Sequence, residues 1–73
     1  MERIEVNPKI LGGKPVIKGT RIPVYLILEL VAAGYKTEDI IKEYPHLKKE
    51  DIKAAIEYAS DILKKEEIIK AKA

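Results

Sequence analysis

Proline and glycine are concentrated at one end of this chain, and this distribution limits what the chain can fold into. Six of the eight proline and glycine residues lie within the first 23 positions. Both residue types interrupt helices, so this third of the chain cannot form a long helix. Its apolar residues are mostly β-branched and occur in short runs between turn residues, which is typical of brief strands. We predict strands at residues 3–6, 15–17 and 21–24, with turns at residues 12–14 and 18–20.

The apolar residues of the remaining chain recur at helical spacing. A first helix is predicted from residue 24 until Gly34, a left-handed cap; it is apolar nearly all round, so we expect it to be buried on most sides. A second, short helix is predicted with Thr37 as its N-cap and Pro45 as its end. A third helix is predicted to start after Leu47 and to carry an unbroken apolar stripe.

At 73 residues, the chain can form one small domain only. A lone core of this size supplies about 3–5 kcal/mol. With no cysteine and a single histidine, we expect no disulfide, no structural metal and no cofactor. We therefore expect a homodimer in which strands of the arm pair or swap between two copies. The predicted parts of this single domain are a strand-rich N-terminal arm (residues 1–23), a three-helix unit (24–63) and a helical or frayed tail (64–73).

The charges nearly balance, with 14 basic and 12 acidic residues. This excludes a uniformly basic nucleic-acid tail but allows a local basic patch. The arm carries five basic and two acidic residues, and further lysines lie where the third helix begins. The longest apolar stretch, residues 24–33, is too short to span a membrane. The charged N-terminus does not resemble a leader sequence, so we expect a soluble, cytoplasmic, prokaryotic protein without membrane contact.

The residues that usually carry catalysis are poorly arranged for it. The only serine, Ser60, lies on the third helix, and the only histidine, His46, lies well before it, so no nucleophile has a nearby base. The adjacent acidic pairs are residues 38–39, 50–51 and 66–67, and neighbours in sequence point in different directions on a helix. We therefore expect no enzyme activity. His46 is predicted to lie in the turn between helices, where it packs or contacts a partner; a metal ligand is the lesser alternative.

The order of the helices is that of a helix-turn-helix unit, in which the start of the last helix enters the DNA major groove. Here that start carries His46, Lys48, Lys49 and Lys53. A solvated helix face has the same appearance, so the helices alone leave DNA binding and a plain solvated surface equally open.

The N-terminal third adds a family resemblance. The run PVIKGTRIPV (residues 15–24) is followed in register by LILE (26–29), AAG (32–34), TEDI (37–40), YPHL (44–47) and EDI (50–52). These motifs resemble the signature of the domain-of-unknown-function 433 family over about residues 3–63. The resemblance implies a homeodomain-like helix-turn-helix fold with a strand-rich extension. It also implies a VapB-type antitoxin that pairs with a PIN-like nuclease toxin and binds its own promoter.

Lys48 departs from the family pattern, in which Thr or Ser often caps the third helix. A lysine side chain cannot accept hydrogen bonds from the free backbone N–H groups of the helix, and losing such a cap typically costs about 1 kcal/mol. Two interpretations stay open: Lys48 contacts a phosphate, or the helix starts one residue away.

The candidate sites follow from these considerations. We expect DNA contacts from basic residues of the third helix and the arm: His46, Lys48, Lys49, Lys53, Lys14, Lys18 and Arg21. For Arg21, a structural role is equally open. Apolar residues late in the chain are predicted to bind a protein partner: Leu63, Ile68 and Ile69. The alternative function is an interaction module that masks a toxin without binding DNA, and whether the lysines share one face distinguishes the two.

Overall fold

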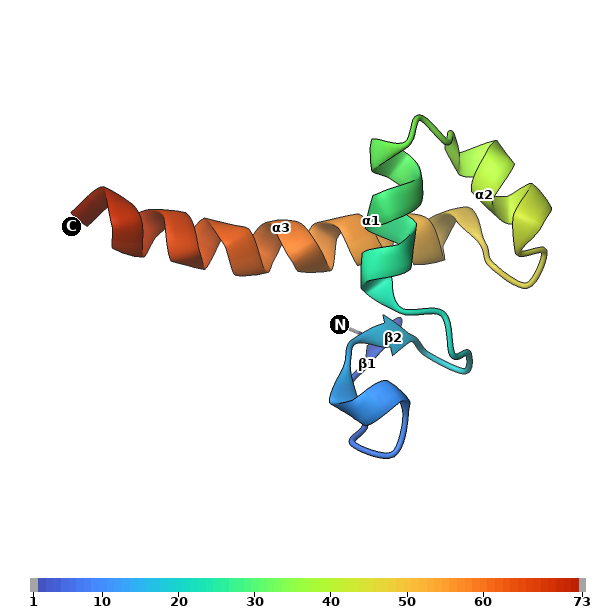
Figure 1. Ribbon diagram of the computed structural model, residues 1–73, viewed down its shortest axis with the longest axis horizontal. Coiled ribbons are helices and arrows are strands. Elements are labelled where there is room, and N and C mark those ends of the chain that lie inside the picture. Colours follow the sequence, from blue (N-terminus) through green and yellow to red (C-terminus); the bar gives the residue numbers. More distant parts are fainter. Residues whose placement is uncertain (1, 73) are drawn as a thin grey trace.

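The computed structural model describes the backbone of residues 2–72 and the side chains of residues 2–65. It is mainly helical, with a small antiparallel sheet at the N-terminus (Figure 1). The elements in chain order are β1 (Ile4–Glu5), a one-turn 3-10 helix η1 (Leu11–Gly13), β2 (Val16–Ile17), α1 (Val24–Ala32), α2 (Thr37–Glu43) and α3 (Lys49–Lys72). The predicted mainly α fold with a strand-containing arm is confirmed.

The arm is a two-stranded hairpin rather than the three strands that the sequence predicts. Ile4 of β1 pairs with Ile17 of β2. The segment predicted as a third strand is reduced to a single bridge between Val16 and Pro23. Pro23 has no backbone N–H to donate, so the ladder cannot continue through it. The segment nevertheless stays beside β2, because the Val24 N–H donates to the Pro15 carbonyl over 2.9 Å.

The predicted turn at residues 18–20 is confirmed, and Thr20 holds it together. Its hydroxyl donates to the Ile17 carbonyl over 2.7 Å and accepts from the Ile22 N–H at 3.0 Å. Gly19 has a φ of +81°, which L side chains rarely adopt. Gly19 and Thr20 therefore have a structural role.

Two helices, α2 and α3, begin with the same arrangement, and the side-chain cap predicted for α2 is absent. α2 begins at Thr37 itself, so Thr37 is not its N-cap; Lys36 occupies that position. The Lys36 N–H donates to Oδ2 of Asp39 over 2.8 Å. At α3, the Lys48 N–H donates to Oδ2 of Asp51 over 2.9 Å. In both helices, a carboxylate three residues on binds the N-cap N–H, which is one half of a capping box.

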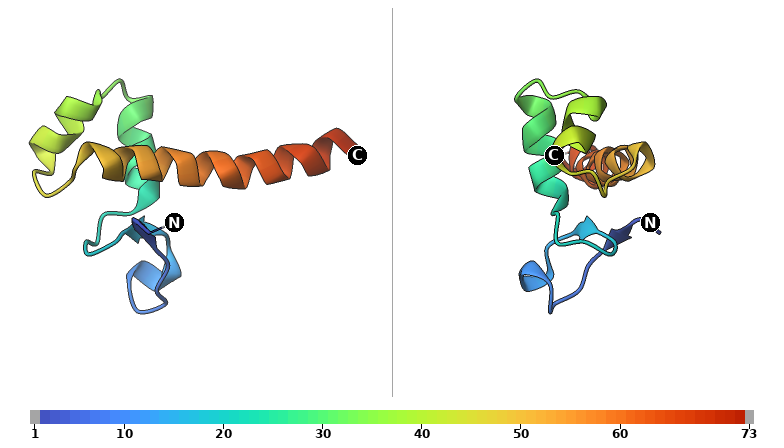
Figure 2. Two further views of the ribbon diagram at one scale, coloured as in Figure 1. Left: turned by 180° about the vertical axis from the view of Figure 1, so that it is seen from behind. Right: turned by 90° about the vertical axis from the view of Figure 1, so that its right-hand side faces the viewer.

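The core contains one isoleucine from each strand and each α-helix. Ile4, Ile17, Ile27, Ile40 and Ile52 are all buried in one cluster. α1 packs across α3, and the sheet lies below this crossing (Figure 2).

The expectation that α1 is buried on most sides is wrong. Within α1, only Val24 and Ile27 are buried, whereas Tyr25 and Val31 are exposed. The rest of a single chain covers only one face of this helix.

The molecule is elongated because α3 extends well past the other elements (Figure 1). Its principal extents are 43 × 31 × 19 Å, and its radius of gyration is 13.2 Å. A compact domain of this length would have a radius of gyration of about 11 Å. No helix in the described part of the chain combines the length and apolar character that crossing a membrane requires.

Candidate functional site

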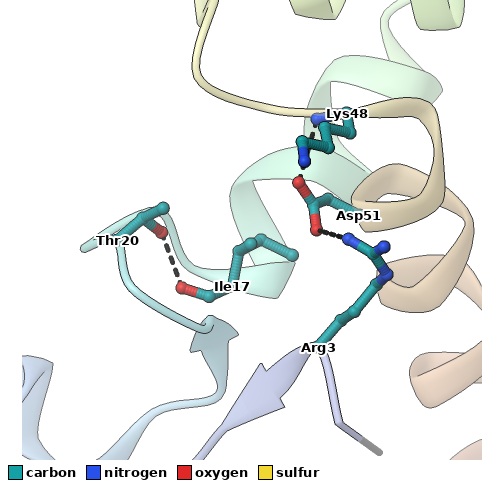
Figure 3. Close-up of polar contacts among 5 residues, drawn as sticks. All are labelled: Arg3, Ile17, Thr20, Lys48 and Asp51. Atoms are coloured by element: carbon teal, nitrogen blue, oxygen red, sulfur yellow. Dashed lines mark hydrogen bonds and ion pairs between the residues drawn. The ribbon is translucent and has the colours of Figure 1, made fainter.

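The start of α3 is tied to the N-terminal arm by one carboxylate. Oδ1 of Asp51 accepts a hydrogen bond from Nη1 of Arg3 at 2.8 Å, while Oδ2 accepts from the Lys48 N–H (Figure 3). Asp51 is buried and Arg3 is exposed. Both oxygens of one side chain therefore fix the first turn of α3, one to its own backbone and one to the strand region.

The position of the helix start excludes one of the two interpretations of Lys48, namely that the helix begins one residue away. α3 begins at Lys49, so Lys48 occupies the N-cap position and the helix start is not displaced. The backbone of Lys48 is used in the cap, and its side chain is exposed. A phosphate contact of that side chain stays a prediction.

The basic residues at the start of α3 are exposed, but acidic residues lie among them. His46, Lys48, Lys49 and Lys53 are all accessible. Lys49 and Lys53, one turn apart, line an open hollow of about 420 Å³ between α3 and the start of α2. Glu38 and Glu57 line the same hollow. His46 lies in the turn between α2 and α3, as predicted, and its side chain is exposed.

The basic residues of the arm do not all join this cluster. Lys14 lies elsewhere, with its Nζ 5.2 Å from the centre of the Tyr25 ring, in a cation–π arrangement. Lys18 and Arg21 are exposed beside the hairpin turn. Among the described side chains, no hydrogen bond or ion pair ties Arg21 to a neighbour. The structure therefore brings Lys49 and Lys53 together at one hollow and places Lys14 at a different surface.

That second surface is an apolar groove between α1 and α3, with a volume of about 290 Å³. We call it the α1–α3 groove; Tyr25, Leu28, Tyr58, Ala59, Ile62 and Leu63 form its walls, and Lys14 lies at its rim. The groove contains Leu63, which was predicted to contact a partner. The side chains of Ile68 and Ile69, predicted with it, lie outside the described residues.

Sequence reasoning missed three of the residues that shape these surfaces. Arg3 was not singled out, because 48 positions separate it from Asp51 and nothing local connects them. Tyr25 and Tyr58 were missed because neither falls on the apolar stripe predicted for its helix. An apolar residue at the edge of a helical stripe was the signal that could have indicated them.

The chain belongs to the family described as "Protein of unknown function (DUF433)", whose model matches residues 4–59. It is similar to the uncharacterised protein y4eO of Sinorhizobium fredii, with 45% identity over 58 residues, which are 80% of this chain and 26% of that protein. An uncharacterised protein of Archaeoglobus fulgidus is 71% identical over 24 residues, which are 33% of this chain and 67% of that protein. The crystal structure of a DUF433 member protein from Anabaena variabilis has a TM-score of 0.80 at 30% identity, covering 86% of this chain and 62% of that one. The chain thus spans only part of the Sinorhizobium and Anabaena relatives.

Proposed function

We propose that this chain is a non-catalytic, DNA-binding antitoxin of a type II toxin–antitoxin pair. It acts as a homodimer in the prokaryotic cytoplasm, neutralises a PIN-like nuclease toxin and represses its own promoter. One observation supports this most: α3 has exposed lysines at its start and an uncovered apolar face further along. One helix thus offers a surface for phosphates and a separate surface for proteins. The family resemblance supplies the biological setting.

The DNA contact is assigned to α2, the following turn and the start of α3, acting as a helix-turn-helix unit. Lys49 and Lys53 are separated by one helical turn and are both exposed, so both can reach the backbone of one DNA segment. A lysine is a mobile point charge without the planar fork of arginine, so it suits phosphates better than bases. Sequence specificity is therefore expected to be modest. In a two-fold dimer, two such helix starts would meet successive major grooves about 34 Å apart on a palindromic site.

Arg3 and Asp51 support this assignment, because they hold the first turn of α3 against the arm. A DNA-reading element placed on a fixed helix loses less conformational freedom on binding. The acidic neighbours Glu38 and Glu57 disfavour DNA binding, because they reduce the local positive potential.

The second candidate function is a module that masks a toxin without binding DNA. It is favoured by those acid neighbours and by the position of Lys14 at the apolar groove rather than beside Lys49. In this alternative, phosphate contacts are too few to supply affinity.

A DNA titration distinguishes the two functions. The protein is titrated with the DNA upstream of its own gene at several salt concentrations, alone and with its toxin. Each lysine that neutralises a phosphate contributes about 0.9 to the slope of log affinity against log salt. Lys49→Ala and Lys53→Ala should each weaken binding to all sequences and flatten that slope by about this amount.

The matched control is Lys9→Ala, because Lys9 is an exposed lysine that lies outside α2, the following turn and α3. This control should leave the slope unchanged. Absence of binding by the native protein at low salt, both alone and with toxin, would exclude the DNA role and leave the masking function.

A further inference from the structure

The chain exposes more surface than one compact domain of its mass. Its accessible surface is 5549 Å². A monomeric protein of 8.2 kDa is expected to expose about 4,500 Å². The excess is roughly 1,000 Å², and a stable protein–protein interface buries about 800 Å² on each partner. The excess surface of the free chain is therefore about as large as the area that one partner buries in such an interface.

Part of this surface lies on α3. The helix has 24 residues, which corresponds to about 36 Å at 1.5 Å per residue. Among its described side chains, which extend to residue 65, the buried ones all lie in the first two turns and end at Ala55. Further along, Ile62 and Leu63 are 43% and 60% exposed. A helix segment in water gains most of its stability from packing of its apolar face, and this face is unpacked in the single chain.

The α1–α3 groove lies where α3 leaves the core. Tyr25, which is 50% exposed, forms one wall from α1, and Ile62 and Leu63 form the other from α3. At this point, the part of α3 that projects beyond the core passes the side of α1 (Figure 1). Each chain therefore carries an apolar groove, and Ile62 and Leu63 form an exposed apolar ridge along its edge.

We infer that a second copy of this chain fills the groove with the projecting part of its own α3. The two α3 helices run antiparallel about a two-fold axis. Because a two-fold contact is made twice, the ridge of each copy enters the groove of the other, and both apolar surfaces are covered at once. A second copy already carries both complementary surfaces, whereas a chain of another kind would have to supply each of them separately.

The arm does not need a second copy in order to pair its two strands. β1 and β2 pair with each other within the chain. The predicted strand exchange is therefore not required, and the dimer contact is assigned to the helices. The inference rests on the homodimer of the proposed function, but it makes no use of DNA binding.

Sedimentation equilibrium over a range of micromolar concentrations tests the inference. The native chain should be a dimer. Leu63→Glu and Tyr25→Glu each place a charge in the groove, from α3 and from α1 respectively, and each should raise the dissociation constant of the dimer at least tenfold. The matched control is Val6→Glu, because Val6 is a similarly exposed apolar residue of the arm, at 58%. Circular dichroism of each variant verifies that the domain stays folded.

Each outcome either supports or overturns the inference. The expected pattern is a native dimer that both groove variants weaken and the arm variant does not. A monomeric native chain overturns it, and so do groove variants that stay fully dimeric. Dissociation by Val6→Glu alone would assign the interface to the arm. Loss of toxin binding without loss of the dimer in the groove variants would assign the groove to the toxin.

The same samples separate this inference from the DNA role. If the native chain is a dimer but does not bind DNA at low salt, the inference stands and the DNA role is excluded. If the native chain is a monomer that binds DNA, the DNA role stands and the inference is overturned.

Discussion

Asp51 connects more of the structure than any other described polar side chain. It accepts from the backbone of its own helix and from the guanidinium of Arg3, 48 positions earlier. Hydrogen bonds that involve a charged partner contribute about 1.5–3 kcal/mol when the site is shielded from water. Arg3 is exposed and regains water when its partner is lost, so the lower part of this range applies to the pair.

Replacement of Asp51 should therefore destabilise the domain. We expect Asp51→Ala to lower the free energy of unfolding by about 1–3 kcal/mol, since it removes both the helix cap and the tie to the arm. The measurement is urea-induced unfolding at a fixed protein concentration. Glu50→Ala is the control, because Glu50 has the same charge in the same helical turn but is exposed. It should change stability by less than about 0.5 kcal/mol. Equal effects of the two substitutions would mean that charge at the helix end, rather than the specific contacts, is responsible.

Among the elements, α1 ends with a complete Schellman motif. The Tyr35 N–H donates to the Leu30 carbonyl, and the Gly34 N–H donates to the Val31 carbonyl, each over 3.0 Å. Gly34 has a φ of +97°. No neighbouring atom lies within 4 Å of where its Cβ would be. A side chain at this position would thus meet backbone strain only, without a clash.

Gly34→Ala should cost about 1–2 kcal/mol of stability for that reason. Gly34→Asn should cost less, because asparagine tolerates the left-handed conformation. Thermal unfolding of the two variants beside the native chain provides the comparison. If both variants lose the same stability, lack of space rather than backbone conformation would be the cause.

Local signals in the sequence predicted the elements well. The spacing of apolar residues located all three helices, and Gly34 and Pro45 indicated where two of them end. The prediction of a third strand was wrong, because a proline within the segment interrupts the ladder, although its β-branched neighbours favour a strand. The burial of α1 was overestimated, because periodicity identifies an apolar face but not whether anything in the chain covers it.

The candidate site was less predictable than the fold. The cluster at the start of α3 could be recognised, since its basic residues are near in sequence. The contact between Arg3 and Asp51 could not, because it depends on how the arm folds back onto α3. The α1–α3 groove likewise depends on the angle at which two helices cross, which no local pattern specifies.

For the molecule as a whole, an interface that covers the projecting helix links folding to association. A dimer dissociates as it unfolds, so mass action makes its melting temperature rise with protein concentration. We expect this rise for the native chain in calorimetric scans over a hundredfold range of concentration. Leu63→Glu should melt at a temperature that does not depend on concentration. A native melting temperature that stays constant over the range would indicate that the monomer is the folding unit.

The length of α3 also determines the distance between the first turns of the two α3 helices in a dimer. In a pair whose α3 helices cross between Ile62 and Leu63, each Asp51 lies about 17 Å from the two-fold axis, at 1.5 Å per residue. The two first turns are then about 35 Å apart, close to one turn of B-DNA. The dimer contact would thus determine the distance between the two half-sites of the operator. Seven residues inserted between Lys53 and Ile62 would keep the helix faces aligned and add about 21 Å to the span. That is roughly six base pairs, which would move the second half-site to the opposite side of the duplex.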